Sequence, residues 1–579
     1  MLNNFNEISI DPKFANCLDC GHQAKYSPTL AICPVCSSQW LEAGYDYSRI
    51  GSRLPSLLVG RPFNLWRYRE LLPIKEHNHS LLMGEGGTPL IRAHNLGMML
   101  GCPNIFIKDE RQGPTASFKD RQAAVSIAAL KEAGIIEVVL ASTGNVAIAY
   151  SAYAARAGIR LWAFLTSLVP AEKMREVALY GTQVVKVTSS YDQTKKVAEE
   201  FAHQRGLYLE RGSRSIPSVE AMKTIAFEVC EQLAEIDIHS EGSQQSSNSS
   251  ELSNEAMVRG RFLAPDWYFQ AVSGGLGPLG VSKGFRELHK MALIDHVPAI
   301  AGIQAEGCSP MVQAWKEDRD TAQPVASPRT HITTLSTGDP GRTYKLLRQQ
   351  MKSGSGGTFE SVSDEEAFRA MHILAKMEGI SVEPAAAVAF AGLIKLVRSG
   401  MIGSNEVIVV NCSGHTMPIE PVILGERWAR NITLSASEVD TPQEGLLGAL
   451  SKVTDDRFPH VLVVDDTEEA RRLIRRVLQA QGNYSIMEAE NGRLAIDIAR
   501  RELPDLVILD LMMPELDGFE VLDTLKADPN TAPIPVIVVT AKELTQDEKR
   551  RLDGQISILM QRGEFLSDEL LEEVKALIE

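Results

Sequence analysis

Apolar and polar positions follow one another along most of the chain in the pattern of alternating strands and helices. Between Gly84 and about Gly425, short β-rich apolar runs are separated by segments of helical periodicity such as 146–157 and 385–397. This alternation predicts an α/β unit with mostly parallel sheets. The apolar runs are 138–141, 161–165, 184–187, 268–272, 300–304 and 407–410.

The same alternation begins again near residue 459. Apolar runs at 460–464, 506–509 and 536–540 are separated by helical patterns, the first of which is rich in arginine pairs. Such repeats within about 120 residues predict a second, doubly wound domain over 459–579. Polar residues 431–458 are interpreted as a linker.

The length of 579 residues also requires more than one hydrophobic core. We assign residues 43–430 to the first α/β domain. Within it, residues 240–254 are rich in Ser, Gln, Asn and Glu, a composition that cannot form a core, and we predict a disordered insertion there.

Four of the eight cysteines form two Cys-x-x-Cys pairs. Cys17 with Cys20 and Cys33 with Cys36 have the spacing that brings four thiolates around one tetrahedral zinc ion. Disulfides would need an oxidising compartment, and no secretory signal precedes the pairs. We therefore predict a structural zinc ribbon over residues 16–42, held together by the metal because it is too small for a core of its own.

The charge distribution limits the partners that the protein can have. The formal net charge is −15, and most of the excess acid lies in the last fifth of the chain. Without a basic stripe we expect no nucleic-acid binding, and without a long apolar run we expect no membrane span. These features predict a cytoplasmic protein.

The first candidate for chemistry is Lys119, which begins a helical pattern directly after a Gly-Pro-Thr turn and Ser117-Phe118. A lysine amine becomes a useful nucleophile when its surroundings lower its pKa, and it can then hold pyridoxal phosphate as an imine. A lone lysine at a helix start is more often simply solvated. The interpretation of Lys119 therefore depends on its neighbours.

Three further loops follow predicted strands. The loop from Ser142 to Asn145 opens a helix, so its backbone N–H groups suit a carboxylate, and the amide of Asn145 can bond an aromatic oxygen. The loop from Ser273 to Gly277 carries glycines that let the backbone curve around a phosphate, although many such loops are only tight turns. In the third loop, Ser413 can place its hydroxyl against a pyridine nitrogen.

With several other motifs, these loops resemble the fold-type II pyridoxal-phosphate enzymes, whose two-subdomain core is tryptophan synthase β-like, and specifically the threonine synthase family. The resemblance covers about Cys17 to Pro418, ribbon included, and its motifs occur in the order of the family. The matching stretches are 84–90, 108–110, 114–120, 142–145, 304–308, 338–340, 378–384 and 413–415.

The resemblance implies a role for each matching residue. Lys119 would hold the cofactor as an imine and move protons between substrate carbons, with Phe118 against the cofactor ring. Asn145 would hold the phenolic oxygen, and Ser142 and Thr143 would receive the substrate carboxylate. The other implied cofactor-binding residues are Ser273, Gly274, Gly275, Leu276 and Gly277 at the phosphate and Ser413 at the pyridine nitrogen.

The reaction implied is the conversion of O-phosphohomoserine and water into threonine and phosphate by a carbon–oxygen lyase. A hydroxyl at the pyridine nitrogen fits elimination and replacement chemistry better than transamination. Gly113 stands where the family usually has Asn, Val146 replaces a small hydroxyl residue, and the phosphate loop is less rich in Gly and Asn. A threonine or serine dehydratase, a β-replacement synthase that uses O-phosphoserine, and a weakened domain that senses an amino acid or the cofactor stay open as alternatives.

Residues 459–579 closely resemble a response-regulator receiver domain, a flavodoxin-like fold. Asp465, Asp466 and Asp510 follow strands, and three converging carboxylates bind Mg²⁺ while Asp510 accepts a phosphoryl group. Thr540 and Arg562 would be the switch residues, Arg562 replacing the usual lysine.

The receiver also departs from its family at Leu559, where an aromatic switch residue is common, so the usual coupling between phosphorylation and conformation is in doubt. A receiver that is folded but silent, used only for docking, is the alternative. The resemblances imply a sensor histidine kinase as the partner of the receiver and a homodimer for the enzyme.

Overall fold

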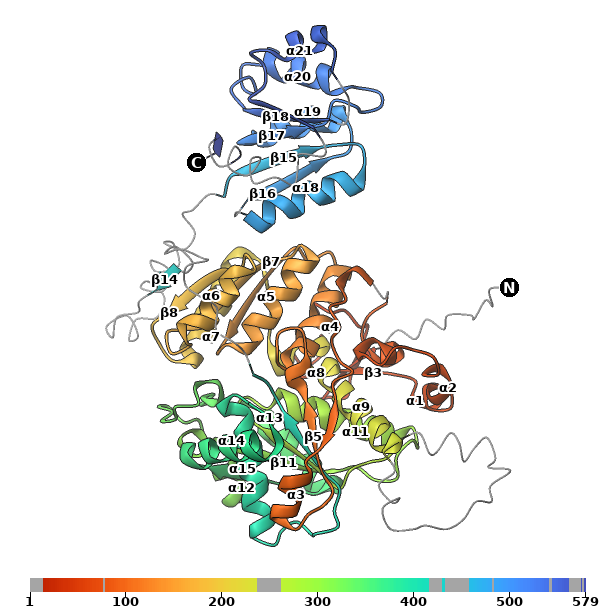
Figure 1. Ribbon diagram of the computed structural model, residues 1–579, viewed down its shortest axis with the longest axis vertical. Coiled ribbons are helices and arrows are strands. Elements are labelled where there is room, and N and C mark those ends of the chain that lie inside the picture. The colour runs from red at the N-terminus through yellow and green to blue at the C-terminus, as the bar shows by residue number, and fades with distance from the viewer. Residues whose placement is uncertain are drawn as a thin grey trace. The chain divides into compact units, whose positions relative to one another are not determined.

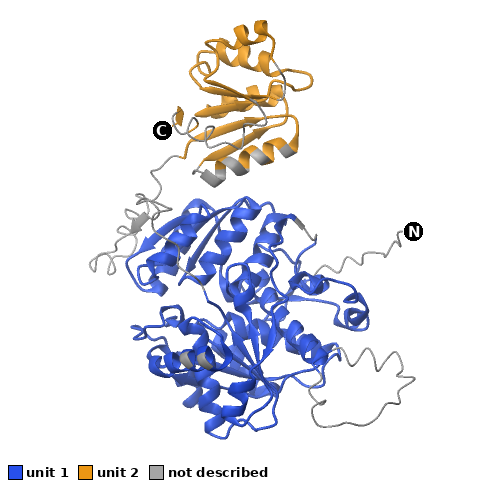
Figure 2. Ribbon diagram, viewed as in Figure 1, with its two compact units in different colours: residues 1–446 blue, residues 447–579 orange. Residues whose placement is uncertain are grey.

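The computed structural model describes residues 14–75, 79–236, 262–415, 430–432, 458–481, 484–540, 544–561, 574 and 577–578. The chain divides into two compact units, residues 1–446 and 447–579 (Figure 2). Among the described residues, no helix has the length and apolar character needed to cross a membrane. The predicted insertion at 240–254, most of the linker 431–458, and Arg562 lie outside the described residues.

A small antiparallel sheet begins the described part of the first unit. Strand β1 (Phe14–Cys17) lies in the middle, between β2 (Gln23–Ala24) and β3 (Leu41–Gly44). These short strands bring the two cysteine pairs together, as the spacing predicted.

Two larger sheets form the body of the first unit, and they are parallel except for one edge, where β4 runs antiparallel to β5. Both are flanked by helices, for example α5 and α6 beside β7 and β8 in Figure 1. The predicted α/β architecture is thereby confirmed. The six-stranded sheet has the order β12 (Gly357–Val362), β11 (Ala299–Ala305), β10 (Trp267–Ala271), β13 (Ile408–Cys412), β5 (Ile105–Asp109), β4 (Leu90–Arg92). The five-stranded sheet has the order β14 (Arg430–Ile432), β8 (Gln183–Val187), β7 (Arg160–Thr166), β6 (Glu137–Ser142), β9 (Tyr208–Leu209).

Most residues of the central strands are buried, because helices cover these sheets on both faces. Each sheet and its helices have a separate apolar cluster, and a third cluster joins the ribbon to the body. The helices are α1 (Tyr47–Gly51), α2 (Leu54–Leu57), α3 (His94–Leu100), α4 (Lys119–Glu132), α5 (Asn145–Ala157), α6 (Ala171–Leu179), α7 (Tyr191–Arg205), α8 (Ile216–Met222), α9 (Thr224–Glu235), α11 (Leu276–Lys290), α12 (Pro310–Lys316), α13 (Thr343–Gln350), α14 (Asp364–Glu378) and α15 (Pro384–Arg398).

A fully buried ionic network joins elements of the two larger sheets. The carboxylate of Glu228 on α9 accepts hydrogen bonds from Arg121 of α4 at 2.6 and 2.7 Å, from Lys108 of β5 at 2.8 Å and from the backbone N–H of Gly87 at 2.9 Å. Arg121 also pairs with Glu110 at 2.8 Å. Burial alone would raise the pKa of Glu228, but Arg121 and Lys108 outweigh it and lower that pKa to about 2.

The second unit is a parallel five-stranded sheet, confirming the predicted doubly wound domain. Its strands have separate apolar clusters on their two faces. The strand order is β16 (Ser485–Ala489), β15 (His460–Val464), β17 (Leu506–Leu509), β18 (Val536–Thr540), β19 (Ile558–Gln561), and the helices are α18 (Glu468–Gln481), α19 (Gly492–Glu502), α20 (Gly518–Ala527) and α21 (Gln546–Leu552).

Candidate active site

A cavity of about 670 Å³ opens beside Lys119 in the first unit. Its walls come from the loops after β6, β10 and β13, from the start of α4, and from the ribbon. Because parallel strands end at the same edge of a sheet, residues distant in sequence meet in this one space. Of the residues predicted for the cofactor and substrate, the cavity is lined by Phe118, Lys119, Thr143, Asn145, Ser273, Gly274, Gly275, Leu276, Gly277 and Ser413.

Lys119 is held by a strained turn. Ala116 has a φ of 54°, an uncommon left-handed conformation for a residue with a side chain. Its carbonyl accepts from the backbone N–H of His415 at 2.8 Å, and a β-bridge joins Ser117 to Gly414. The loop after β13 therefore fixes the backbone that presents Lys119 to the cavity.

The Lys119 amine lies 4.0 Å from the centre of the Phe118 ring. Burial disfavours its charged form and lowers its pKa to about 8, although the nearby carboxylate of Glu383 partly opposes this shift. A substantial fraction of the amine is thus neutral near pH 7 to 8, which suits both imine formation and proton transfer.

Asn145 begins α5 and faces two charged residues. Its amide donates to Glu383 at 2.7 Å and accepts from Lys173 of α6 at 2.7 Å, while Lys173 also lies 3.1 Å from Glu383. Asn145 and Glu383 lie in stretches that match the family, whereas no sequence motif indicated Lys173. These partners fix the orientation of the Asn145 amide.

The backbone of the glycine loop after β10 has a conformation suited to binding a phosphate. Gly275 has a φ of 87° and caps α11, a conformation that a side chain would strain. A Cβ at Gly277 would lie 2.1 Å from Gln270, whereas at Gly274 it would meet only Thr337 at 3.9 Å and otherwise point into open space. The loop thus leaves room for a phosphate against the first turn of α11.

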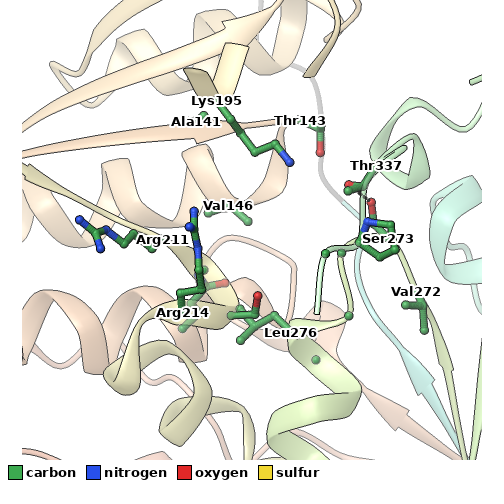
Figure 3. Close-up of a pocket in the computed structure, with 18 of the residues that line it drawn as sticks. Ala141, Thr143, Val146, Lys195, Arg211, Arg214, Val272, Ser273, Leu276 and Thr337 are labelled. Atoms are coloured by element: carbon green, nitrogen blue, oxygen red, sulfur yellow. Dashed lines mark hydrogen bonds between the residues drawn. The ribbon is translucent and has the colours of Figure 1, made fainter. Parts of the chain in front are cut away.

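Two hydroxyls lie at this loop. Ser273 and Thr337 are hydrogen-bonded to each other at 2.6 Å, and both line the cavity (Figure 3). Thr337 was not identified from the sequence; it lies in the loop between η6 (Thr333–Leu335) and α13, directly before the matching stretch 338–340 and not within it. Ser413, which follows β13, also lines the cavity and is buried.

Ser142 and Thr143 differ although they are adjacent. Thr143 lines the cavity, whereas Ser142 is buried behind it and its hydroxyl accepts from the backbone N–H groups of Gly144 at 3.0 Å and Ala147 at 3.1 Å. The structure thus places the Ser142 side chain in the turn that starts α5 and not in the cavity lining.

Three basic side chains also line the cavity. Lys195 comes from α7, and Arg211 and Arg214 lie at the short helix η4 (Gly212–Arg214) after β9. Figure 3 shows both arginines on the side of the cavity opposite Ser273 and Thr337. We name Lys195, Arg211 and Arg214 the basic group; no sequence motif indicated it.

The ribbon cysteines have the geometry of a metal centre. The sulfurs of Cys17 and Cys36 are 3.5 Å apart, those of Cys20 and Cys33 are 3.7 Å apart, and all four lie within 4.8 Å of one another. Four sulfurs bound to zinc at about 2.3 Å are separated by about 3.8 Å. The distances therefore fit a shared zinc ion and are far longer than a disulfide.

The receiver unit brings its three predicted carboxylates together. Asp465 follows β15 and Asp510 follows β17, and together with Asp466 they offer oxygens within 4.8 Å of one another. Asp465 also accepts from the hydroxyl of Thr467 at 2.7 Å. Thr540 ends the next strand, β18, and is buried.

Comparison with known proteins agrees with both units. The family described as pyridoxal-phosphate dependent enzyme matches residues 81–414, and the response regulator receiver domain matches residues 461–561. The chain is therefore a pyridoxal-phosphate-dependent enzyme joined to a receiver domain.

Similar proteins narrow the class further. Threonine synthase of Methanocaldococcus jannaschii is 33% identical over 69% of this chain and 91% of its own length, and that of Methanosarcina acetivorans is 31% identical over 75% and 98%. The Mycobacterium tuberculosis threonine synthase is 30% identical over 60% of this chain and 86% of its own. The chain belongs to the threonine synthase family.

Proposed function

We propose that the enzyme unit converts O-phosphohomoserine and water into threonine and phosphate. The observation that carries this proposal is the presence, in one cavity, of two regions suited to phosphate: the glycine loop for a cofactor and the basic group for a substrate. A dehydratase acting on free threonine or serine has no phosphate for the second region to bind. The names of the relatives favour the same reaction.

The cavity fits pyridoxal phosphate, because a reactive lysine, a glycine cradle and a buried hydroxyl surround it. In this proposal Lys119 holds the cofactor covalently, Phe118 lies against its ring, and Ser413 bonds the pyridine nitrogen. Asn145 bonds the ring oxygen, since an amide NH₂ has two hydrogens and can also donate to Glu383. When bound, the cofactor supplies an electron sink for carbanions.

The amine of Lys119 takes a proton from one substrate carbon and returns it to another, and its pKa of about 8 suits this exchange near neutral pH. Thr143, beside the first turn of α5, receives the substrate carboxylate, and Ser142 shapes that turn. The basic group binds the phosphate of the substrate through charge-assisted hydrogen bonds.

The two single-residue departures of the enzyme unit from its family, Gly113 and Val146, differ in importance. A Cβ at Gly113 would lie 2.4 Å from the carboxylate of Asp120, which caps the turn through Thr115 at 2.6 and 2.9 Å. Packing thus accounts for Gly113, which does not line the cavity, whereas Val146 does. We propose that Thr143 supplies the hydroxyl that is missing at Val146.

Incubation of the full chain, loaded with pyridoxal phosphate, with O-phosphohomoserine tests the reaction. Phosphate and threonine should appear in equal amounts. Phosphate with 2-oxobutanoate but without threonine would indicate a diverted lyase, and the absence of any turnover would favour an amino-acid sensor.

For the second unit, we propose that Asp510 accepts a phosphoryl group from a sensor histidine kinase, with Mg²⁺ held by Asp465, Asp466 and Asp510. Thr540 and Arg562 would respond to the phosphoryl group. A small phosphodonor with Mg²⁺ should label the wild type but not the Asp510→Asn variant. Equal labelling of both would contradict the assignment.

We further propose that the ribbon cysteines bind zinc structurally, that the enzyme is a homodimer and that it works in the cytoplasm. The proposed domain limits are 16–42 for the ribbon, 43–430 for the enzyme, 431–458 for the linker and 459–579 for the receiver. Metal analysis, light scattering and limited proteolysis test these points.

A further inference from the structure

The ribbon forms part of the wall of the active-site cavity. Asp19, Ser38, Gln39 and Trp40 line it together with residues of the enzyme body. A structural metal module that only stabilised the chain would have no need to reach this space.

Two of these ribbon side chains bond arginines that also line the cavity. The side-chain oxygen of Gln39 accepts from the guanidinium of Arg214, and Asp19 accepts from that of Arg342. Asp19 and Arg342 are 39% and 26% exposed, and solvent weakens such an ion pair. The bond between Gln39 and Arg214 is the better candidate for a role, because Arg214 belongs to the basic group.

The position of Gln39 depends on both cysteine pairs. The carbonyl of Ser38 accepts from the N–H of Cys33 at 2.7 Å, and the carbonyl of Trp40 accepts from the N–H of Leu18 at 3.0 Å. The segment that carries Gln39 is thus bonded on one side to a cysteine of the second pair and on the other to the neighbour of Cys17. A metal that fixes the cysteines also fixes this segment.

Arg214 has the properties of a residue that needs a positioning partner. Arginine is a long side chain with many rotamers, and fixing it costs entropy at the moment of binding unless another group has already ordered it. Its planar guanidinium has five N–H donors, so one bond to Gln39 leaves others to face a phosphate. Burial also lowers its pKa, as expected for a cation removed from water beside Arg211.

We propose that Gln39 is a positioning residue that orients Arg214 toward the phosphate of the substrate, so that the metal-organised ribbon sets the affinity for phosphorylated substrate. This inference rests on the proposed function, because it assigns the basic group to the substrate phosphate. It predicts that the ribbon affects phosphate recognition and leaves the cofactor end of the cavity unchanged.

Gln39→Met tests the proposal, because methionine keeps the length of glutamine but removes its acceptor. Gln23→Met is the matched control, since Gln23 is an exposed glutamine on β2 of the same ribbon. We expect the KM for O-phosphohomoserine and the Kd for inorganic phosphate to rise about tenfold in Gln39→Met, the usual effect of one hydrogen bond. The kcat should stay within about twofold, and the absorption change of the cofactor on adding L-threonine, which lacks phosphate, should be unchanged.

The outcomes separate this proposal from the proposed function. Absence of turnover by the wild type would refute the proposed function, and phosphate binding by calorimetry would still decide the role of Gln39. Unchanged phosphate binding in Gln39→Met, or equal weakening of phosphate and L-threonine binding, would overturn the positioning role. A wild-type protein that binds no phosphate would also overturn the positioning role.

Metal removal from the holoenzyme by a chelator gives a second test. Phosphate affinity should fall by about the same factor as in Gln39→Met, with the cofactor spectrum retained, and zinc should restore it. Removal of metal without any change in phosphate affinity, or with loss of the cofactor spectrum, would overturn the part of the proposal that links the ribbon to the substrate.

Discussion

The enzyme unit and the receiver unit both place their predicted functional residues at the ends of parallel strands, but they do so on different scales. The receiver carboxylates come from the loops after two strands and lie within 4.8 Å of one another. The enzyme cavity of about 670 Å³ takes residues from two sheets, several helices and the ribbon. A small ion needs only neighbouring strand ends, whereas a cofactor and a substrate need walls from distant parts of the chain.

The largest expected effect tests whether the two units act through separate chemistry. Lys119→Ala should lower threonine formation by at least about 10³-fold, because it removes the amine that would hold the cofactor and transfer protons. Phosphate release and the cofactor absorption spectrum measure the loss.

The receiver provides the control for this variant. Labelling of Asp510 by a small phosphodonor should be unchanged in Lys119→Ala, since the carboxylates lie in the other compact unit. A loss of labelling would show that phosphorylation of Asp510 depends on Lys119 in the enzyme unit.

The second effect concerns the stability of the enzyme unit alone. Glu228→Ala leaves Arg121 and Lys108 buried without their shared carboxylate, at a cost of about 3–5 kcal/mol in the free energy of unfolding. Thermal unfolding of the full chain should show an earlier transition for the enzyme unit and an unchanged one for the receiver. Glu235→Ala, at an exposed position of the same helix α9, serves as the matched control, and a similar shift there would contradict the assignment.

A smaller effect is expected at the cofactor phosphate. Thr337→Val removes the hydroxyl that bonds Ser273 at 2.6 Å but keeps the shape of the side chain. The affinity of the apoenzyme for pyridoxal phosphate should fall about three- to tenfold, the value of one hydrogen bond. Fluorescence titration measures this affinity. An unchanged affinity would show that Thr337 does not contribute to binding of the cofactor phosphate.

The smallest effect is a shift in pH dependence. The neutral form of Lys119 attacks the cofactor aldehyde, so reconstitution of the apoenzyme should speed up as pH rises through about 8. Glu383 stabilises the charged amine, and Glu383→Gln should therefore move the midpoint to lower pH. Stopped-flow absorbance between pH 6 and 10 covers the range, and a midpoint moved upward would contradict the role of Glu383.

The comparison of the two units also explains what the sequence could predict. The strands β6, β7, β8, β10, β11, β13, β15, β17 and β18, the position of Lys119 at the start of α4 and the loops after β6, β10 and β13 were predicted, because each carries a local pattern of apolar residues and turn residues. Arg214 and Lys195 carry no such pattern, and Thr337 lies just outside the matching stretch 338–340. They reach the cavity through tertiary packing, which a single sequence does not display.

Ser142 shows a second limit. Its place in a motif pointed to the substrate, yet its hydroxyl is bonded to two backbone N–H groups of the turn. A motif identifies a loop reliably, but the direction of each side chain depends on local backbone bonds. Arg562 in the receiver stays a prediction, since it lies outside the described residues.

The carboxylate of Glu228 also restricts how the enzyme unit can open. It bonds Lys108 of the six-stranded sheet and Arg121 of the helix that begins at Lys119. A rigid-body movement of one sheet and its helices away from the other would therefore break these bonds and leave buried charges without partners. The two sheets are linked at this point, in the first turn of the helix that begins at Lys119. We therefore expect any movement that admits substrate to occur in segments that do not contact Glu228, while Lys119 stays in place.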